Sequence, residues 1–500
     1  MSTYKKFTER MQKIADINNS AALLQWDQEV YMPPKSAGRR AQQLSTLAGL
    51  AHEMFTADET GNLLNELANA DLSDAERANV SYTQGEYDKY KKVPKEFVEK
   101  TSAAVSKAFQ SWNNAKQQKD FSLYAPDLEA LLELKLQECE YLGYEGHPYN
   151  AQLDIYEKNM TVDQLEVLFG QVKARLFPFI EKIYHAEQVS DALMYQHFDK
   201  DKQWDYGIEI LKQIGYDLNA GRQDVSSHPF TTNFSATDVR VTTRIDEHNL
   251  SEMLWSTIHE GGHALYEQGL KDENYGLPSG SYLTLGMHES QSRLWENNVG
   301  RSLNFWQGNF ARLQELFPGQ LGNHNATDFF KAMNKVQPSP IRTNADELTY
   351  HFHVLIRYEI EKELFEKKLK VADLKDRWNA MYKQYLGLDI KNDAEGVLQD
   401  IHWSHGSFGY FPTYSIGSFY AAQFYAQAVQ DIPGLEDDIR AKNPVKLLEW
   451  LQTNIHQHGR RYPADELCKR VTGEILNFDY FMRYVEEKYA SIYDLSGVGV

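Results

Sequence analysis

The stretch N-L-S-E-M-L-W-S-T-I-H-E-G-G-H-A-L-Y-E-Q-G, from Asn249 to Gly269, decides how this sequence is interpreted. Asn249 can cap a helix at its start and Gly269 can end it, so the stretch predicts a helix of about five turns. His259 and His263 stand four residues apart, which puts both imidazoles on one helix face with Cβ atoms about 5–6 Å apart. Two imidazoles at that separation can bind one Zn²⁺, so we expect a zinc site here.

The three residues between these histidines carry further information. Glu260 would lie beside the open coordination position, where a carboxylate can take a proton from water. Gly261 and Gly262 each cost a helix up to about 1 kcal/mol relative to alanine. Such a cost indicates that another part of the chain approaches the backbone closely.

A catalytic zinc needs a third protein ligand and one position left for water. Gly269 stands where the extended H-E-x-x-H-x-x-G-x-x-H motif would have its third histidine, so that motif is absent. An acidic ligand from a following helix is the natural alternative. Spacing favours Glu289, in the H-E-S-Q sequence, and leaves three rivals open: Asp272, Glu273 and Glu296.

The rest of the chain predicts an all-α fold with a small antiparallel β element. Amphipathic helix patterns dominate, and no Pro/Gly/Ser-rich linker or repeat interrupts the 500 residues. The exception is the segment from Phe234 to Arg244, whose D-V-R-V-T-T-R pattern alternates as a strand does. We therefore expect one unit over 1–500, with an N-terminal helical part to about residue 220 and a catalytic part from about 221.

The net charge and the search for targeting signals limit the classes of partner and the cellular location that we expect. The sequence has 52 Lys and Arg against 71 Asp and Glu, a net charge of −19, which disfavours nucleic acid and membrane partners. No secretory signal is evident, and Cys139 and Cys468 lie in no metal-binding pattern, so we expect a cytoplasmic protein with two reduced thiols. Neither a G-x-S-x-G elbow nor a nucleotide-binding glycine loop is present.

Several motifs occur in the order typical of one family. They are H-P-F (His228–Phe230), D-V-R-V-T (Asp238–Thr242), H-E-G-G-H (His259–His263), H-E-S-Q (His288–Gln291), I-R-T-N-A-D (Ile341–Asp346) and G-V-L-Q-D-I-H-W (Gly396–Trp403). The likeness extends to L-Q-W-D-Q-E-V-Y-M-P-P (Leu24–Pro34) and to G-S-F-G-Y-F-P-T-Y (Gly406–Tyr414). Across nearly its whole length, the sequence resembles the carboxypeptidase Taq family of zinc metallocarboxypeptidases.

This resemblance implies a gluzincin-like helical body with a long groove, of which the N-terminal part would form one wall. It implies homodimers and one zinc per chain, for which cobalt could substitute. It also implies broad-specificity release of amino acids from the C-termini of peptides. In the family, the glutamate of H-E-S-Q is the third zinc ligand, which favours Glu289 over its rivals.

An enzyme that acts at C-termini must bind a carboxylate, and the planar guanidinium of arginine does this with two parallel hydrogen bonds. Arg240 and Arg342 are the candidates, although Arg342 could instead pair with Asp346 four residues on. Asp238 and Thr242 are better suited to hold Arg240 in place than to touch substrate. His228 could contact substrate or pack in the groove wall.

The reaction also needs a donor for the oxyanion of the tetrahedral intermediate. The run from Gln399 to Tyr414 combines histidines, tyrosines and glycines before a helix, and it resembles the oxyanion-stabilising loops of other helical zinc peptidases. Its candidates are Tyr414, Tyr410, His402 and His405.

The sequence thus predicts a zinc carboxypeptidase in which His259, His263 and Glu289 bind zinc and Glu260 is the general acid and base. Two alternatives stay open. One is a zinc oligopeptidase that cuts internal bonds, and the other is a helical peptide-binding scaffold without turnover.

Overall fold

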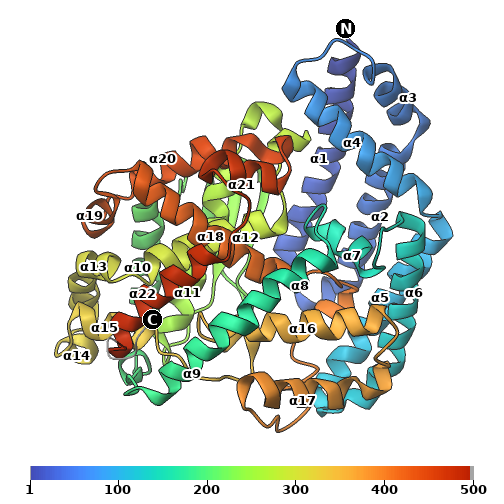
Figure 1. The fold of residues 1–500 in the computed structure, drawn as a ribbon. Helices are drawn as coiled ribbons and strands as arrows, with labels where there is room; N and C mark the ends of the chain where they lie inside the picture. Colours follow the sequence, from blue (N-terminus) through green and yellow to red (C-terminus); the bar gives the residue numbers. More distant parts are fainter. Residues whose placement is uncertain (1, 496–500) are drawn as a thin grey trace. The chain divides into compact units, whose positions relative to one another are not determined.

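The computed structural model describes residues 2–495, and most of them are helical (Figure 1). The chain divides into two compact units, each assembled from three stretches. Unit 1 comprises Met1–Asp88, Ser190–Met333 and Gly417–Asn477, and unit 2 comprises Lys89–Val189, Asn334–Ile416 and Phe478–Val500. The predicted division near residue 220, with one groove wall formed by the first part, stays a prediction.

Unit 1 contains the N-terminal helices, the sheet and most of the C-terminal helices. Its helices are α1 (Thr3–Val30), α2 (Ala37–Thr56), α3 (Asp58–Leu67), α4 (Asp74–Lys92), α10 (Lys200–Ile214), α11 (Leu250–Gln268), α12 (Leu285–Arg293), α13 (Leu303–Leu316), α14 (Pro318–Leu321), α15 (Ala326–Met333), α18 (Pro412–Asp431), α19 (Leu435–Arg440), α20 (Val445–Asn454) and α21 (Ala464–Thr472). The C-terminal end of α4 and the N-terminal end of α18 belong to unit 2. A π-helical turn, Leu294–Gly300, continues α12.

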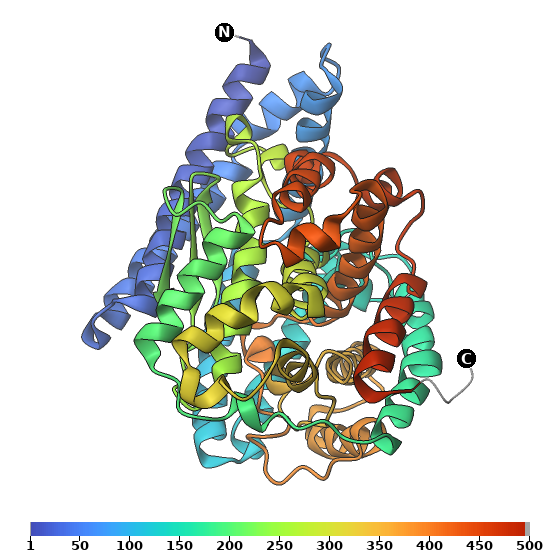
Figure 2. The ribbon, with the colours of Figure 1, turned by 90° about the vertical axis from the view of Figure 1, so that its left-hand side faces the viewer.

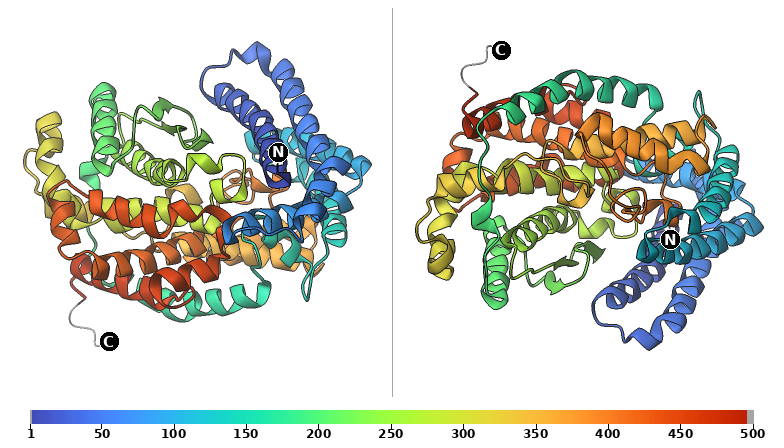
Figure 3. Two further views of the ribbon diagram at one scale, coloured as in Figure 1. Left: turned by 90° about the horizontal axis from the view of Figure 1, so that it is seen from above. Right: turned by 90° about the horizontal axis from the view of Figure 1, so that it is seen from below.

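The sheet of unit 1 has three strands, β1 (Gly221–Val225), β2 (Thr231–Ser235) and β3 (Asp238–Thr243), in the order β1-β3-β2. The β2 and β3 strands form an antiparallel hairpin, as predicted, whereas β1 runs parallel to β3. The sheet is therefore mixed, because β3 lies between two strands of opposite direction. The side chains of Val239 and Val241 are buried, and α11 packs against β3 (Figure 3). Figure 2 shows α1 running alongside the sheet, where it contacts β2.

The stretch that carries the paired histidines folds as predicted. It forms α11, whose N-cap is Asn249 and whose C-cap is Gly269. The Asn249 side chain accepts a hydrogen bond from the backbone N–H of Ser251, which satisfies one of the free donors at the helix start. The predicted all-α class with one small β element is confirmed.

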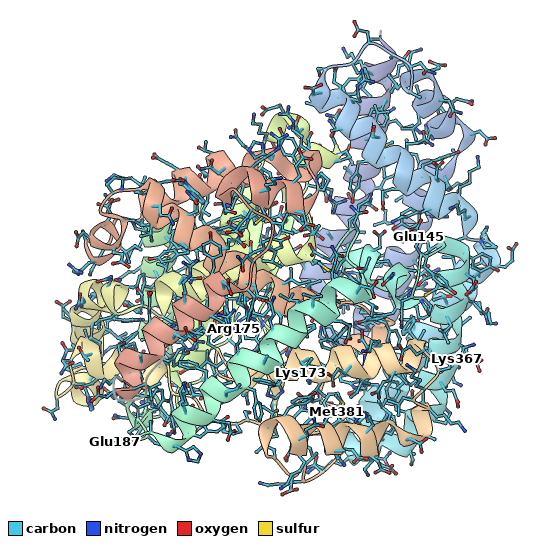
Figure 4. The ribbon with its side chains drawn as sticks, in the orientation of Figure 1. Glu145, Lys173, Arg175, Glu187, Lys367 and Met381 are labelled. Atoms are coloured by element: carbon cyan, nitrogen blue, oxygen red, sulfur yellow. The ribbon has the colours of Figure 1, made fainter. Side chains whose placement is uncertain are left out.

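Unit 2 consists of packed helices and has no strand among its described residues. Its helices are α5 (Lys95–Gln118), α6 (Ala125–Leu142), α7 (Tyr149–Tyr156), α8 (Val162–Gln171), α9 (Phe177–His185), α16 (Tyr350–Phe365), α17 (Leu374–Leu386) and α22 (Asp479–Tyr493). A π-helical turn, Val172–Leu176, joins α8 and α9 into one long rod, on which Figure 4 labels Lys173 and Arg175. The central helix is α16, which packs against α17 and buries most of its residues (Figure 1).

Among residues 2–495, no helix is both long and apolar enough to cross a membrane. The thiols of Cys139 and Cys468 are free and buried, and burial raises the pKa of each to about 12. Thiols in such surroundings are unreactive, which agrees with the predicted role in the core.

Candidate active site

The α11 helix presents His259 and His263 on one face, and α12 brings Glu289 to them. The Nε2 atoms of His259 and His263 lie 3.8 and 3.5 Å from Oε2 of Glu289. These three ligand atoms all lie within 4.8 Å of one another. Two imidazole nitrogens and one carboxylate oxygen at such separations fit a divalent metal ion of the zinc type. We call these three residues the candidate metal site.

Glycines allow the helices of this site to approach each other. A Cβ atom on Gly262 would lie 2.6 Å from Cα of Ser292, so α11 and α12 could not pack this closely with alanine there. A Cβ atom on Gly417 of α18 would lie 2.6 Å from Cβ of Glu289. The predicted close approach to the glycines between the two histidines is confirmed, and Glu289 is held between α11 and α18.

Hydrogen bonds to the outer nitrogens orient both imidazoles. Nδ1 of His259 lies 2.9 Å from Oε2 of Glu296, and Nδ1 of His263 lies 3.1 Å from the backbone carbonyl oxygen of His288. When Nδ1 donates to such acceptors, Nε2 is left with a lone pair for a metal ion. Both rings are therefore arranged as ligands through Nε2.

The electrostatics of the site favour a cation. Burial raises the pKa of Glu289, but Arg293, whose Nε donates to Glu289 at 2.7 Å, and the two histidines lower it to about 2. Burial lowers the pKa of His263 to about 3, which keeps that imidazole neutral. A charged carboxylate next to a neutral imidazole is the protonation state that metal binding requires.

The three rivals for the third ligand lie elsewhere. Glu296 contacts the outer nitrogen of His259 and accepts hydrogen bonds from Arg293 at 3.1 Å and Arg301 at 2.9 Å. Asp272 and Glu273 are exposed on a short 3₁₀ turn, Asp272–Asn274. Among the four acidic candidates, the structure brings only Glu289 to both Nε2 atoms.

Glu260 is 7 % exposed, and burial raises the pKa of its carboxyl group. The Thr231 hydroxyl of β2 donates to Oε2 of Glu260 at 2.6 Å. A raised pKa suits a group that takes up and releases a proton near neutral pH. Thr231 was not singled out from the sequence, because its partner lies 29 residues away on a different element.

A series of hydrogen-bonded polar side chains supports His263 and was not identified from the sequence. The ring of His288 stacks on that of His263, with centroids 4.3 Å apart. Nε2 of His288 lies 3.0 Å from Oε1 of Glu267, and the amide of Asn233 donates to Oε2 of Glu267 at 2.7 Å. Glu267 follows His263 by four residues in α11, and this spacing is the only sign in the sequence that Glu267 lies on the same helix face as His263.

Arg240 is fixed on β3 by its neighbours. Its Nε and Nη2 atoms each donate to the carboxylate of Asp238 at 2.9 Å, as the sequence suggested. Its guanidinium lies 4.4 Å from the ring centroid of Trp26 in α1 and 5.0 Å from that of Phe234. The side chain is 18 % exposed, so these contacts do not enclose it completely.

His228 is exposed in the segment before β2. The Thr242 hydroxyl accepts hydrogen bonds from the backbone N–H of Phe230 at 2.9 Å and from the Ser226 hydroxyl at 2.7 Å. Thr242 therefore fixes the segment that contains His228 and makes no hydrogen bond to Arg240 among the described contacts.

Arg342 lies in unit 2, in the 3₁₀ turn Arg342–Asn344, and the next helix, α16, begins at Tyr350. Its Nε donates to Asp400 at 3.0 Å and its Nη1 donates to the Tyr350 hydroxyl at 2.8 Å. The predicted alternative pairing with Asp346 does not occur, since Asp346 instead accepts from the backbone N–H of Leu348.

A second arginine that sequence reasoning missed shares the same carboxylate. Arg357 is fully buried, and its Nε donates to Asp400 at 2.7 Å. Burial raises the pKa of Asp400, but Arg342 and Arg357 outweigh it and hold that pKa far below its ordinary value. We call Arg342, Arg357 and Asp400 the arginine cluster. Two guanidinium groups share one carboxylate there, which leaves a local excess of positive charge.

The segment His402–Tyr414, here the aromatic loop, brings three of its four candidates together. Nε2 of His402 lies 3.2 Å from the Tyr414 hydroxyl, and the ring centroid of Tyr410 lies 5.0 Å from that of His402. Burial and Arg342 lower the pKa of His402 to about 3. His405 lies apart from this group, exposed and against the ring of Phe109 in α5.

Comparison with known proteins agrees with this geometry. Residues 6–489 match the family model of carboxypeptidase Taq (M32) metallopeptidases. Carboxypeptidase 1 of Bacillus subtilis (strain 168) is 37 % identical over 98 % of this chain and 99 % of its own. The crystal structure of the M32 carboxypeptidase from Deinococcus radiodurans R1 has a TM-score of 0.97 at 39 % identity, over 99 % of this chain and 100 % of its own. A structure described as that of CHT has a TM-score of 0.96 at 53 % identity, over 98 % and 99 %. The chain therefore belongs to the carboxypeptidase Taq (M32) family and is a metallocarboxypeptidase.

Proposed function

We propose that this enzyme is a zinc-dependent carboxypeptidase of broad specificity that removes amino acids one at a time from the C-termini of peptides. The observation that carries the proposal is the candidate metal site, with Glu260 next to it on α11. His259, His263 and Glu289 would hold the metal. The donor set of two imidazoles and one carboxylate is typical of catalytic zinc and suits cobalt as well.

When bound there, zinc supplies Lewis acidity for the scissile carbonyl and lowers the pKa of water. Glu260 takes the proton of the attacking water and passes it to the leaving amine. Its raised pKa supports this role, because a carboxyl group that holds a proton more tightly is a better base and can deliver that proton later. Thr231 holds the carboxyl group in place with its hydroxyl.

Arg240 and Arg342 bind the terminal carboxylate of the peptide in this proposal. The excess of positive charge in the arginine cluster supports a role for Arg342, since an incoming carboxylate would balance it. The partial exposure of the Arg240 side chain supports a second contact. His228, exposed beside the sheet, is a further candidate for contact with the peptide.

Tyr414, Tyr410 and His402 donate to the oxyanion in this proposal. Their mutual contacts in the aromatic loop support a joint role. His405 was predicted with them, and its place against Phe109 gives it less support. We further propose, on the family resemblance alone, a homodimer, which light scattering of the purified protein would test. Fractionation of cells would test the cytoplasmic location that we also propose.

A time course on an unblocked mixed-sequence peptide, followed by mass spectrometry, tests the proposal. We expect products that are shorter by one residue at a time from the C-terminus, and we expect a chelator to stop their formation. Internal fragments from an end-blocked peptide would indicate an oligopeptidase instead. A protein without zinc and without hydrolysis would indicate a binding scaffold.

A further inference from the structure

Glu361 is a fully buried carboxyl group of α16 to which the proposed function gives no role. Three donors in unit 2 point at its two oxygens. The indole N–H of Trp403 donates to Oε1 at 2.7 Å, and the backbone N–H of Gly409 donates to Oε2 at 2.8 Å. The Tyr149 hydroxyl of α7 also donates to Oε2.

Two of these donors belong to the aromatic loop, and each is the direct neighbour of a proposed active-site residue. Trp403 follows His402, and Gly409 precedes Tyr410. One carboxyl group therefore ties together two points of the loop. A displacement of the backbone at either point would move the imidazole of His402 or the ring of Tyr410.

The backbone at Gly409 shows how tightly the loop is held. Its φ angle is +87°, and a Cβ atom there would lie 2.6 Å from the backbone of Gln152 in α7. Both facts require glycine at this position. The loop is thus pressed between α7 and α16 at the point where Glu361 receives its hydrogen bond.

The face of α16 that carries Glu361 also serves the arginine cluster. Tyr350, Arg357 and Glu361 are seven and four residues apart, a spacing that places them on one side of a helix. Tyr350 accepts from Arg342, and Arg357 donates to Asp400. One helix face therefore supports the arginine cluster and the aromatic loop together.

We propose that Glu361 is a positioning residue for the reaction, which fixes the aromatic loop by accepting hydrogen bonds from both Trp403 and Gly409. This inference rests on the proposed function of His402, Tyr410 and Tyr414. Three donors and no acceptor face the carboxyl group among its described contacts, so both of its oxygens act as acceptors.

The test is Glu361→Gln in the full-length, zinc-loaded enzyme. Glutamine keeps the size of the side chain but puts an N–H₂ donor where donors already point. We expect kcat on a free-acid peptide to fall by about 10- to 100-fold, as for misplaced catalytic groups, with little change in KM. Amide hydrogen exchange should become faster in residues 402–411 and stay unchanged in residues 250–268.

Glu366→Gln is the matched control. Glu366 lies just past the end of α16, is partly exposed and pairs with His147, so the same chemical change leaves the loop intact. Its kcat and its loop exchange should equal those of the wild type. Trp403→Phe is a second variant, for use if Glu361→Gln does not fold. It removes only the indole donor and should also lower kcat.

The proposal is overturned if a folded variant exchanges its loop faster and keeps its kcat, or if the loop exchanges at the wild-type rate. Failure of the proposed function would be seen in the wild-type enzyme itself, which would then release no terminal residue. Failure of the present inference would be seen only in the variants.

Discussion

The candidate metal site of unit 1 and the arginine cluster of unit 2 are both buried and hydrogen-bonded, but their charges are opposite. Near the two histidines, three carboxylates face two guanidinium groups: Glu260, Glu289 and Glu296 against Arg293 and Arg301. Near Asp400, two guanidinium groups face one carboxylate. Buried charge is costly unless it is balanced. From this difference we infer that the candidate metal site suits a bound cation and that the arginine cluster suits a bound anion.

The largest expected effect is the loss of zinc when a ligand of the candidate metal site is removed. His263→Ala removes a ligand nitrogen, so we expect zinc to fall from about one per chain to background and activity to disappear with it. Metal analysis of the purified protein measures this. His324→Ala, on an incompletely buried histidine of unit 1, is the control and should retain zinc. Full zinc content in His263→Ala would move the site elsewhere.

A smaller effect separates metal binding from chemistry within that region. Glu260→Gln should keep its zinc and lose about 10² to 10⁴ in kcat, the range for a missing general acid and base. Glu252→Gln, in the first turn of the same helix, should be close to wild type in both measurements. Near-normal turnover by Glu260→Gln would remove Glu260 from the mechanism.

Much of the first region could be predicted from the sequence, because its signal is local. The spacing of His259 and His263, and the glycines between them, specify a helix face and a close approach. Glu289 needed the family resemblance, since spacing alone left three rivals. Thr231 could not be found in this way, and Glu296 was found only as a rival ligand, because only the folded chain brings them to their partners.

Less of the second region could be predicted, for the same physical reason. Arg342 stands in a recognisable motif, but its real partner is Asp400, 58 residues away, rather than Asp346. Arg357 and Glu361 stand among apolar residues of α16, and nothing in their local sequence indicates which groups they bind. Partners that are distant in the chain leave no periodic pattern.

The support of the metal site gives the next prediction. Glu296→Gln weakens the acceptor at Nδ1 of His259, and changes of this kind lower metal affinity by about 10- to 100-fold. Competition with a zinc chelator measures the affinity. Glu315→Gln, an exposed carboxylate of α13, should leave it unchanged. Equal affinity in Glu296→Gln would show that the histidine needs no such partner.

The last and smallest effect is a change with pH in the unfolding free energy that Glu361 contributes. Burial raises the pKa of Glu361 from its ordinary 4.5 to about 7, whereas the pKa of Glu289 is lowered. A raised pKa in the folded state means stability that is present below pH 4.5 and lost as pH rises toward 7. Relative to Glu361→Gln, the wild type should lose at most about 3 kcal/mol of unfolding free energy over that interval. Urea unfolding at several pH values measures the difference, and parallel curves would contradict it.

The account depends on a cationic region that recognises the peptide's terminal carboxylate. The most direct test is the ratio of kcat/KM for one peptide as its free acid and as its C-terminal amide. Amidation removes a charge-assisted pair worth about 1.5–3 kcal/mol, so we expect the free acid to be favoured by roughly 10- to 150-fold. That preference should shrink in Arg342→Ala and Arg240→Ala. Equal rates on acid and amide, or cuts that appear first inside the peptide, would contradict the account.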